Sequence, residues 1–388
     1  MELTTASRLS DIPADAWDAL NPDEYPFLRH GFLDALERHG AVTARTGWQP
    51  HHLLLHDDDT LVAAVPAYLK SHSWGEFVFD FAWADAYERY GGAYYPKLVG
   101  AIPLTPATGP RVLARPTTDR GDAVDRLASG ARQRASENGL SSAHWLFPNP
   151  DDAAALAAAG YSIRHGCQFH WFNPGYQDFD DFLARLTAKK RKNIRRERRN
   201  VAQAGIRFRI VHGDEAEPAL WDAMHRFYRT TFELHGNLPL ISRDCFAAMG
   251  EALAWRMVLI VAERDGTPIA GAICFRDRQR LYGRYWGCDT EIDGLHFEAC
   301  YYQGIEYCIH HGLQCFEPGA QGEHKIARGF VPTITRSAHY FPDAGFQRAV
   351  SDFLARERRA VYEYAQRLTM EGPYRTEHEP AVVDGREP

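Results

Sequence analysis

A hairpin signal in the second half of the chain constrains the fold more than any other sequence feature. The segment VLIVAERDGTPIAGAICF, residues 258–275, has two apolar runs that flank Asp265 and Gly266. Asp-Gly suits the positive φ angles of a tight turn, so a strand, a turn and a second strand are predicted. The next segments, RLYGRYWGCD and HFEACYYQGIEYCIHHGL, are predicted to form a further strand and a helix that ends at Gly312.

The first half has a similar order of predicted elements. Helices are expected at 14–21, before Gly40, at 119–139 and at 151–160, a hairpin at 51–70, and strands at 75–81, 141–147 and 161–172. The second half adds helices near 179–204, 221–235, 243–254 and 344–370 and a strand at 206–213. Because 388 residues exceed what one core normally serves, two tandem α+β domains are predicted, at 1–175 and 176–375, with a polar tail at 376–388.

Composition excludes several classes of protein. No apolar run reaches the eighteen or more residues of a membrane span, and the first residues have neither the basic nor the apolar region of a signal peptide. The seven cysteines have neither disulfide-like nor zinc-like spacing. A cytoplasmic protein without a metal site is therefore predicted. The sequence does not predict the oligomeric state.

Basic residues gather in one segment of an otherwise acidic chain. Residues 189–200, KKRKNIRRERRN, include eight Lys or Arg and one Glu, although the whole chain has 44 Lys and Arg against 51 Asp and Glu. The apolar residues of this region recur at spacings of three and four, as on one stripe of a helix: Leu183, Leu186, Ile194 and Val201. Glu197 lies on or beside that stripe, which favours an ion pair or a cavity there.

Like charges at this density repel one another, so an anion near the helix would stabilise it. An anion-binding surface is predicted, made of Lys189, Lys190, Arg191, Lys192, Asn193, Arg195 and Arg196. The candidate anions are the tRNA backbone, the phosphates of coenzyme A, a nucleotide-linked acceptor and an anionic membrane surface. The alternative is a solvated helix face whose charges make only local ion pairs.

Six long motifs are spread along the chain: HSWGEFVFDFAWADAYERYGGAYYPKL, PLTPATGPRVL, KRKNIRRERR, LYGRYWGCD, HFEACYYQGIEYCI and GAQGEHKIARGF. Together they resemble the bacterial FemAB-like family of predicted N-acyltransferases, which is related to the Fem aminoacyl transferases and to the GNAT superfamily. The resemblance runs from about Phe27 to Tyr374. It implies two tandem GNAT-like domains with mixed sheets flanked by helices, and an N-acyltransferase activity.

The resemblance also bears on the acyl donor. GNAT enzymes seat the pyrophosphate of coenzyme A at a helix start, after an Arg/Gln-x-x-Gly-x-Gly/Ala loop. The matching segment here, GCDTEIDGLHFEAC, has Gly294 but lacks that spacing. Fem-type transferases also lack the loop and use aminoacyl-tRNA, whose phosphates need a basic surface. Aminoacyl-tRNA is therefore the predicted donor, a coenzyme A thioester is the alternative, and no further cofactor is expected.

The motif GAQGEHKIARGF holds the densest set of polar groups in the second half. Acyl transfer to an amine needs a neutral nucleophile and a stabilised oxyanion. Glu323 or His324 is the predicted base, and the resemblance implies that Lys325 lies beside the acceptor, where it binds an anion or stabilises charge. The alternative is a surface loop whose charges face solvent.

Other residues are predicted to bind substrate because they place polar groups among aromatic ones or on one face of a predicted element. They are Glu76, Asp80, Tyr95, Tyr282, Arg284, Tyr285, Glu298 and Arg328. Glu76 and Asp80 share one face of the strand predicted at 75–81, where they would contact the amine of an acceptor or form structural ion pairs with Arg89 or Lys97.

The predicted function is transfer of an acyl or aminoacyl group to an amine on a small molecule or peptide. The resemblance implies that the acceptor is a peptidoglycan precursor. Two alternatives remain: an acyl-CoA-dependent acetyltransferase with an atypical coenzyme A site, and a non-catalytic protein that binds nucleic acid or phosphate.

Overall fold

The computed structural model describes residues 1–21, 24–320, 322–375 and 383–384. By its internal contacts the chain divides into two units. Unit 1 comprises Met1–Cys167 and Ile334–Tyr364 with the C-terminal end of the chain, and unit 2 comprises Gln168–Thr333 and Ala365–Val383. The predicted tail at 376–388 lies outside the described residues, except for 383 and 384.

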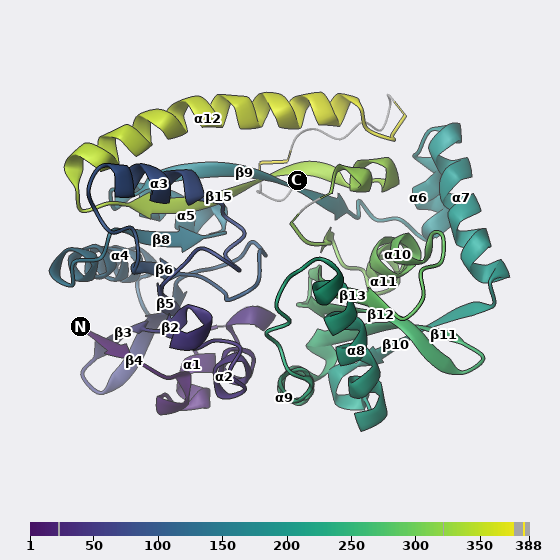
Figure 1. The fold of residues 1–388 in the computed structure, drawn as a ribbon, viewed down its shortest axis with the longest axis horizontal. Helices are drawn as coiled ribbons and strands as arrows, with labels where there is room; N and C mark the ends of the chain where they lie inside the picture. Colours follow the sequence, from purple (N-terminus) through teal and green to yellow (C-terminus); the bar gives the residue numbers. More distant parts are fainter. Residues whose placement is uncertain (22–23, 321, 376–382, 385–388) are drawn as a thin grey trace. The chain divides into compact units, whose positions relative to one another are not determined.

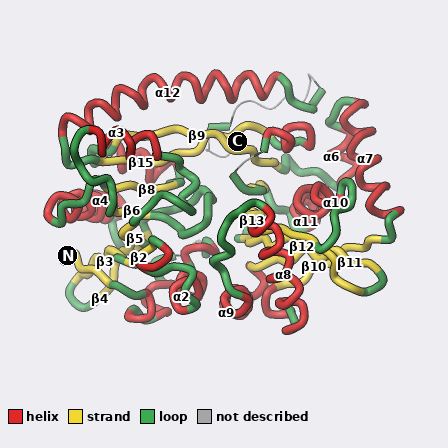
Figure 2. The backbone as a smooth tube through the Cα atoms, in the orientation of Figure 1, coloured by secondary structure: helices red, strands yellow, loops and turns green. Residues whose placement is uncertain are grey.

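The two units are not consecutive, unlike the predicted division at residues 175 and 176. Strands β9 (Ser162–Phe172) and β15 (Val331–Tyr340) and helix α12 (Ala344–Met370) each contribute to both units. Figure 2 shows α12 as one long helix. The chain therefore returns to unit 1 after completing most of unit 2, which the order of predicted elements does not reveal.

Unit 1 contains two groups of paired strands (Figure 1). The first has the order β1 (Glu2–Ala6), β3 (His52–Asp57), β4 (Thr60–Val65) and β7 (Leu113–Ala114), all antiparallel. The second has the order β2 (Trp48–Pro50), β5 (Ala67–Lys70), β6 (Lys97–Gly100), β8 (Ala143–Leu146) and β15, and only β6 and β8 are parallel. The helices are α1 (Ala14–Asp18), α2 (His30–Arg38), α3 (Phe81–Arg89), α4 (Arg120–Glu137) and α5 (Pro150–Ala158).

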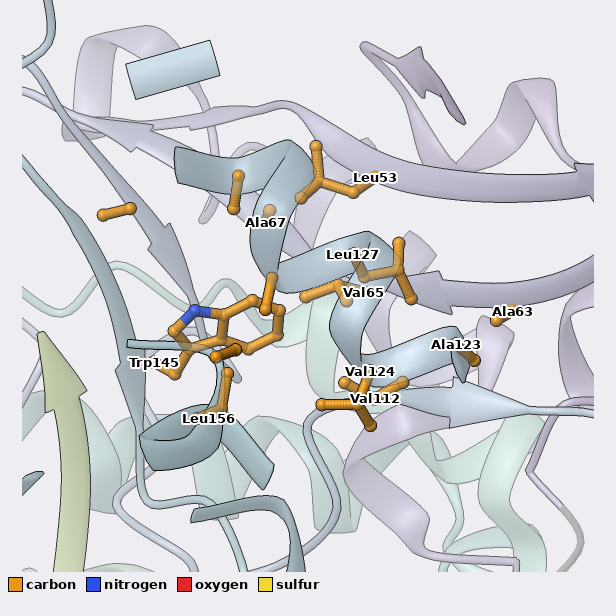
Figure 3. Packing of buried hydrophobic residues seen from close by; sticks show 14 of the residues in the cluster. Leu53, Ala63, Val65, Ala67, Val112, Ala123, Val124, Leu127, Trp145 and Leu156 are labelled. Atoms are coloured by element: carbon orange, nitrogen blue, oxygen red, sulfur yellow. The ribbon is translucent and has the colours of Figure 1, made fainter. Parts of the chain in front are cut away.

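The apolar core of unit 1 lies between these strands and α4 and α5. Leu127 of α4 and Trp145 of β8 are almost fully buried in it, and Leu156 of α5 packs with them (Figure 3). Side-chain caps begin both helices: Asp119 accepts from the Asp122 N–H, and Asn149 accepts from the Asp152 N–H.

The strand predicted at 75–81 is wrong. Residues 73–80 form a loop, since Gly75 and Phe77 have φ angles of 80° and 59°, which an extended strand does not permit. The alternation that suggested a strand arises because Glu76 and Asp80 are buried while Phe77 and Phe79 are exposed. In this loop the carboxylates are buried and the phenylalanines are exposed, which is the reverse of the usual burial of polar and apolar side chains.

Unit 2 is built on a sheet whose strands run in the order β10 (Ile206–His212), β11 (Met257–Arg264), β12 (Thr267–Arg276), β13 (Arg280–Cys288), β14 (Cys315–Glu317) and β9. Strands β13 and β14 are parallel and the other pairs are antiparallel. The helices are α6 (Phe179–Ala184), α7 (Ala188–Gln203), α8 (Pro218–Leu234), α9 (Arg243–Leu253), α10 (Leu295–Phe297) and α11 (Gln303–His310), with a π-helical turn at Glu298–Tyr302 between the last two. A 3₁₀ helix covers Glu323–Arg328.

The structure confirms the β11–β12 hairpin. Asp265 and Gly266 have φ angles of 51° and 76°, as a tight turn with two positive φ angles requires. Buried apolar residues run along both strands, so the hairpin forms the centre of the unit 2 sheet.

The single helix predicted from about residue 179 to 204 is instead two helices. Between them, Leu186 forms a bridge with Tyr374, and the Thr187 N–H donates to the Pro373 carbonyl at 2.8 Å. The Thr187 N–H thus bonds to the segment after α12, whereas the Leu186 N–H still donates to the Leu183 carbonyl of the preceding turn at 3.1 Å. The basic residues lie entirely on α7, which begins at Ala188.

Strands β13 and β14 pair over only three residues. Their ladder joins Arg280–Tyr282 to Cys315–Glu317, and β13 then continues to Cys288 without β14. Just beyond this ladder, β13 has a bulge in its pairing with β12. Gly283 pairs with Cys274 and Tyr285 with Ile273, so Arg284 between them is the extra residue. The two strands thus separate where the polar motif GAQGEHKIARGF begins, after β14.

Candidate active site

Lys325 is one of two buried cations, with Arg328, in the motif that follows β14. Its side chain is 2% exposed, and Nζ donates to the carbonyl oxygen of Gly319 at 2.7 Å. Burial lowers the pKa of Lys325 from 10.5 to about 7, although the nearby Cys300 thiol opposes this. At neutral pH the amine therefore exists in both protonation states, as a group that transfers protons requires.

The hydrogen bond of Lys325 places it near the end of the β13–β14 ladder. A Cβ on Gly319 would lie 3.6 Å from the carbonyl oxygen of Gly283, the residue after the ladder ends. Gly319 has a φ of 100°, which glycine adopts without strain.

The two neighbours of Lys325 in the motif are exposed. His324 Nε2 lies 2.8 Å from the hydroxyl of Tyr301, and Glu323 lies on the surface of the same 3₁₀ helix. Partial burial, with the positive charges of Lys325 and Arg328, lowers the pKa of His324, so the imidazole is neutral at pH 7. Among the three predicted catalytic residues, Lys325 alone is buried.

Arg328 ties the motif to α7. Its guanidinium carbon lies 3.3 Å from the centre of the Phe297 ring, and it donates to Glu197 Oε1 at 3.0 Å. The hydroxyl of Tyr302 donates to the other oxygen of Glu197. Of the ion pair and the cavity that the sequence left open for Glu197, the structure shows an ion pair, with a residue 131 positions away.

A second ion-pair network fastens α7 to the π-helical turn. Arg198 donates to both carboxylate oxygens of Glu298 at 3.2 Å and to Glu306 at 2.7 and 3.0 Å. Burial raises the pKa of Glu298, and Arg198 opposes that rise. Because Glu298 is buried and paired, it is a structural anchor in this state of the protein.

The remaining cations of α7 are exposed, except Lys190 and Arg191, which are half-buried. Arg195 pairs with Asp180 at 2.7 Å on the surface. In the part of the chain that the structure describes, the helix has six further cationic side chains without a hydrogen bond or ion pair: Lys189, Lys190, Arg191, Lys192, Arg196 and Arg199. The first turn has no acidic residue, so the positive end of the helix dipole adds to these charges.

The start of α10 lies against α7 but carries negative charge (Figure 1). A Cβ on Gly294 would lie 3.3 Å from the Glu197 carbonyl oxygen, and Asn200 donates to Asp293 at 3.4 Å. The preceding loop also contains Asp289, paired with Arg226, and Glu291. Carboxylates at a helix start disfavour a bound pyrophosphate. The exposed face of α7, by contrast, carries cations without a carboxylate partner among the described residues.

Comparison with protein families decides the family. A model described as peptidoglycan biosynthesis/recognition, FemAB-like, matches residues 8–376. The chain belongs to the FemAB-like family. This confirms the resemblance carried by the six motifs, and membership supports an acyl- or aminoacyltransferase. Comparison with curated proteins finds no match.

Solved structures confirm the fold of this FemAB-like protein. FemX shares 13% identity over 90% of this chain and 100% of its own, with a TM-score of 0.52. The C-terminal domain of a putative lysylphosphatidylglycerol synthetase from Agrobacterium fabrum shares 11% identity over 88% and 96%, with a TM-score of 0.51. L-PGS from Bacillus licheniformis shares 11% identity over 83% of this chain and 96% of its own, with a TM-score of 0.50. The fold is α+β, with two tandem GNAT-like domains and mixed sheets. Within the described residues no helix combines the length and apolar character of a membrane span.

Three predicted substrate-binding residues of β13 have contacts away from Lys325. Tyr282 is buried and its hydroxyl donates to Asp277 at 2.8 Å. Tyr285 packs against the rings of Tyr228 and Phe246, from α8 and α9. Arg284 occupies the bulge, with its guanidinium carbon 5.2 Å from the Tyr285 ring centre. The bulge interrupts the alternation on which their shared faces were predicted.

The carboxylates predicted in unit 1 meet on Lys97, which is fully buried. Its Nζ donates to Glu76 at 2.8 Å, to Ser73 at 2.8 Å and to Asp80. Tyr95 reaches the same network, with its hydroxyl 2.9 Å from Ser73 Oγ. Burial raises the pKa of Glu76 to about 7. Burial also acts to raise the pKa of Asp80, but the charge of Lys97 and the hydrogen bonds of Lys97, Ser73 and Tyr94 together lower it. Of the two interpretations of these carboxylates, the structure displays the ion pair.

One group of side chains has the composition of a metal site. Among the described residues, His170, Cys315 and Glu317 are buried with potential ligand atoms within 4.8 Å of one another. Arg280 donates to Glu317 at 2.9 Å, so a metal ion here would lie beside a guanidinium that already neutralises the carboxylate. These residues do not fit a metal ion.

Three residues of the π-helical turn were not predicted from the sequence: Cys300 lies near Lys325, Tyr301 contacts His324, and Tyr302 donates to Glu197. The signal was the aromatic density of HFEACYY, next to two polar groups. A π-helical turn is frequent at functional sites but is not readable from periodicity, because it shifts the phase of a helix by one residue.

Proposed function

We propose that this FemAB-like protein is an N-acyltransferase that moves an aminoacyl group from aminoacyl-tRNA to an amine of a peptide acceptor. The observation that carries the proposal is Lys325: a buried lysine whose pKa is lowered to about 7, on a 3₁₀ helix that Arg328 fastens to the basic helix α7. The family description, peptidoglycan biosynthesis/recognition, supports a peptidoglycan precursor peptide as the acceptor. Charged tRNA is made in the cytoplasm, so we place the reaction there.

Lys325 would serve as the proton-transfer group. The acceptor amine attacks the ester carbonyl carbon of the donor, a C–N bond forms, and neutral Lys325 takes the proton that the amine loses. The resulting ammonium stabilises the negative charge on the tetrahedral intermediate. The C–O bond to the ribose then breaks, and Lys325 returns the proton to the departing ribose oxygen. Atoms and charges balance, and Lys325 ends in its starting form.

The charge distribution favours tRNA over coenzyme A as the donor. An extended polyanion is bound by a surface with many unpaired cations, as on α7. Coenzyme A needs a compact pyrophosphate seat, and the helix start at Gly294 follows a loop with three carboxylates. The loop before α10 therefore supports the acyl-CoA alternative less well than the basic face of α7 supports tRNA.

The test of the donor surface is the triple substitution Lys189→Gln, Lys192→Gln and Arg196→Gln. All three side chains are exposed, so the fold should be retained. Each lost phosphate contact removes about 0.7 to 0.9 from the slope of log affinity against log salt concentration, so the variant's slope for tRNA should fall by about 2 to 3.

The matched control removes three cations elsewhere: Arg126→Gln, Arg229→Gln and Arg243→Gln. Arg126 and Arg229 are exposed and Arg243 is half-buried, and they form salt bridges with Asp122, Glu233 and Asp222, respectively. It has the same net charge and should keep the wild-type slope. If the α7 variant binds tRNA with unchanged affinity and slope, the basic helix is only a solvated face.

A further inference from the structure

A cluster of rings surrounds His324 on the surface of unit 2. Its ring centre lies 5.8 Å from Tyr301, 5.9 Å from Phe297 and 6.2 Å from His296. Trp286 of β13 extends the cluster, 5.5 Å from His296. His324 is the exposed member, while the rings beneath it are buried or half-buried. The proton-transfer chemistry assigned to Lys325 uses none of these rings.

The structure holds the His324 ring in place. The Tyr301 hydroxyl contacts Nε2, and the absence of a side chain at Gly322 leaves room for the ring, since a Cβ there would lie 2.4 Å from His324 Cε1. Below it, Phe297 and Tyr301 stack at 19° across the π-helical turn. His296 has a pKa lowered to about 4 by burial, so it also remains uncharged at pH 7.

We propose that the His324 cluster is a stacking platform for the 3′-terminal nucleobase of the RNA donor. This inference rests on the proposed function and adds the contact that positions the donor. Every base has a π face, and bases of single-stranded ends stack on His, Phe, Tyr and Trp rings. An exposed neutral imidazole on a supported layer of rings offers such a surface.

Chain geometry favours an RNA end over coenzyme A as the source of the base. In aminoacyl-tRNA the acyl ester is on the ribose of the terminal nucleotide, next to its base. In acyl-CoA the long pantetheine arm separates the adenine from the thioester. Lys325 follows His324 directly in the chain, so a base stacked on His324 places a ribose ester, and not a thioester, near the buried amine.

The contacts of Arg328 would guide the RNA strand from the stacking platform to α7. Arg328 lies on the Phe297 ring and bonds to Glu197 of α7. The phosphates that precede the terminal nucleotide would then run toward the unpaired cations of that helix. The platform gives one base contact, and α7 gives contacts that are independent of sequence.

The test compares binding of a short single-stranded RNA that ends in ACCA with the same RNA whose terminal nucleotide lacks its base. The wild-type protein should bind the abasic form about 5- to 150-fold more weakly, the range of one stacked base. His324→Ala and Gly322→Ala should abolish this ratio, and His324→Phe should keep it. His235→Ala, which alters an exposed histidine of unit 2 outside the cluster, should leave it unchanged.

The outcomes separate this proposal from the proposed function. If both RNAs bind with equal affinity, or if His324→Ala keeps the wild-type ratio, the platform is refuted while the tRNA donor stands. If neither RNA binds, both proposals fail. Binding of coenzyme A that depends on His324 would assign the rings to the adenine of a different donor and would overturn the inference.

Discussion

Lys325→Met is expected to reduce the rate of acyl transfer by about 10²- to 10⁴-fold, the usual contribution of a general acid–base group. The affinity for tRNA should stay within about twofold, because Nζ is buried and bonds to Gly319. In the wild type the rate should rise with pH through about 7, as the lysine loses its proton. The measurement is single-turnover transfer at saturating donor between pH 6 and 9. A loss of less than tenfold would remove Lys325 from the chemistry.

A stability measurement on the same variant is independent of catalysis. Between pH 7 and 10.5 the unfolded lysine holds a proton that the folded one has lost, so the free energy of unfolding of the wild type rises with pH in this window. Lys325→Met lacks this contribution. The free energy of unfolding of the wild type, relative to that of the variant, should therefore increase by at most about 1.4 kcal/mol per pH unit. Denaturant unfolding of both proteins at pH 7 and pH 9 measures the difference, and a constant difference would mean an ordinary lysine pKa.

Lys97→Met is expected to lower the free energy of unfolding by about 3 to 5 kcal/mol. The substitution leaves Glu76 and Asp80 buried without their cation, and one oxygen of each carboxylate already lacks a hydrogen-bond partner among the described residues. The deficit should be larger at pH 8 than at pH 5, because protonation removes the unpaired negative charges. Denaturant unfolding at the two pH values gives both results.

The control for Lys97 neutralises all members of the network at once. Lys97→Met combined with Glu76→Gln and Asp80→Asn should recover part of the lost stability, since no buried charge remains. If Lys97→Met costs less than about 1 kcal/mol, or if its deficit is independent of pH, the ion pairs do not hold the loop of residues 73–80.

Sequence patterns correctly predicted most of the helices, strands and turns that depend on interactions between residues close together in the chain. The Asp265–Gly266 turn, the long periodic helices and the alternating strands lie where expected, because turn chemistry and apolar spacing act over a few residues. The loop at 73–80 was wrongly predicted as a strand. Its alternation comes from Glu76 and Asp80, which are buried because they pair with Lys97, about twenty positions away. The break before α7 likewise depends on a backbone pairing with Tyr374.

The candidate site was predictable as a set of residue types but not as an arrangement. The motif after β14 identified Glu323, His324 and Lys325 together, yet only packing decides that Lys325 is buried and the others are exposed. Glu197 was recognisable as unusual on an apolar stripe, but its partners Arg328 and Tyr302 lie more than a hundred residues away. Long-range pairs of this kind leave no periodic signal.

The most direct test of the central claim is a comparison of two donors. Transfer of a labelled amino acid from charged tRNA, and of a labelled acetyl group from acetyl-CoA, is measured with a set of amine-bearing peptidoglycan precursor peptides, using wild-type protein and Lys325→Met. The account predicts amide formation from charged tRNA only, lost in the variant. Amide formation from acetyl-CoA in the absence of tRNA, or transfer from tRNA that survives in Lys325→Met, would contradict it.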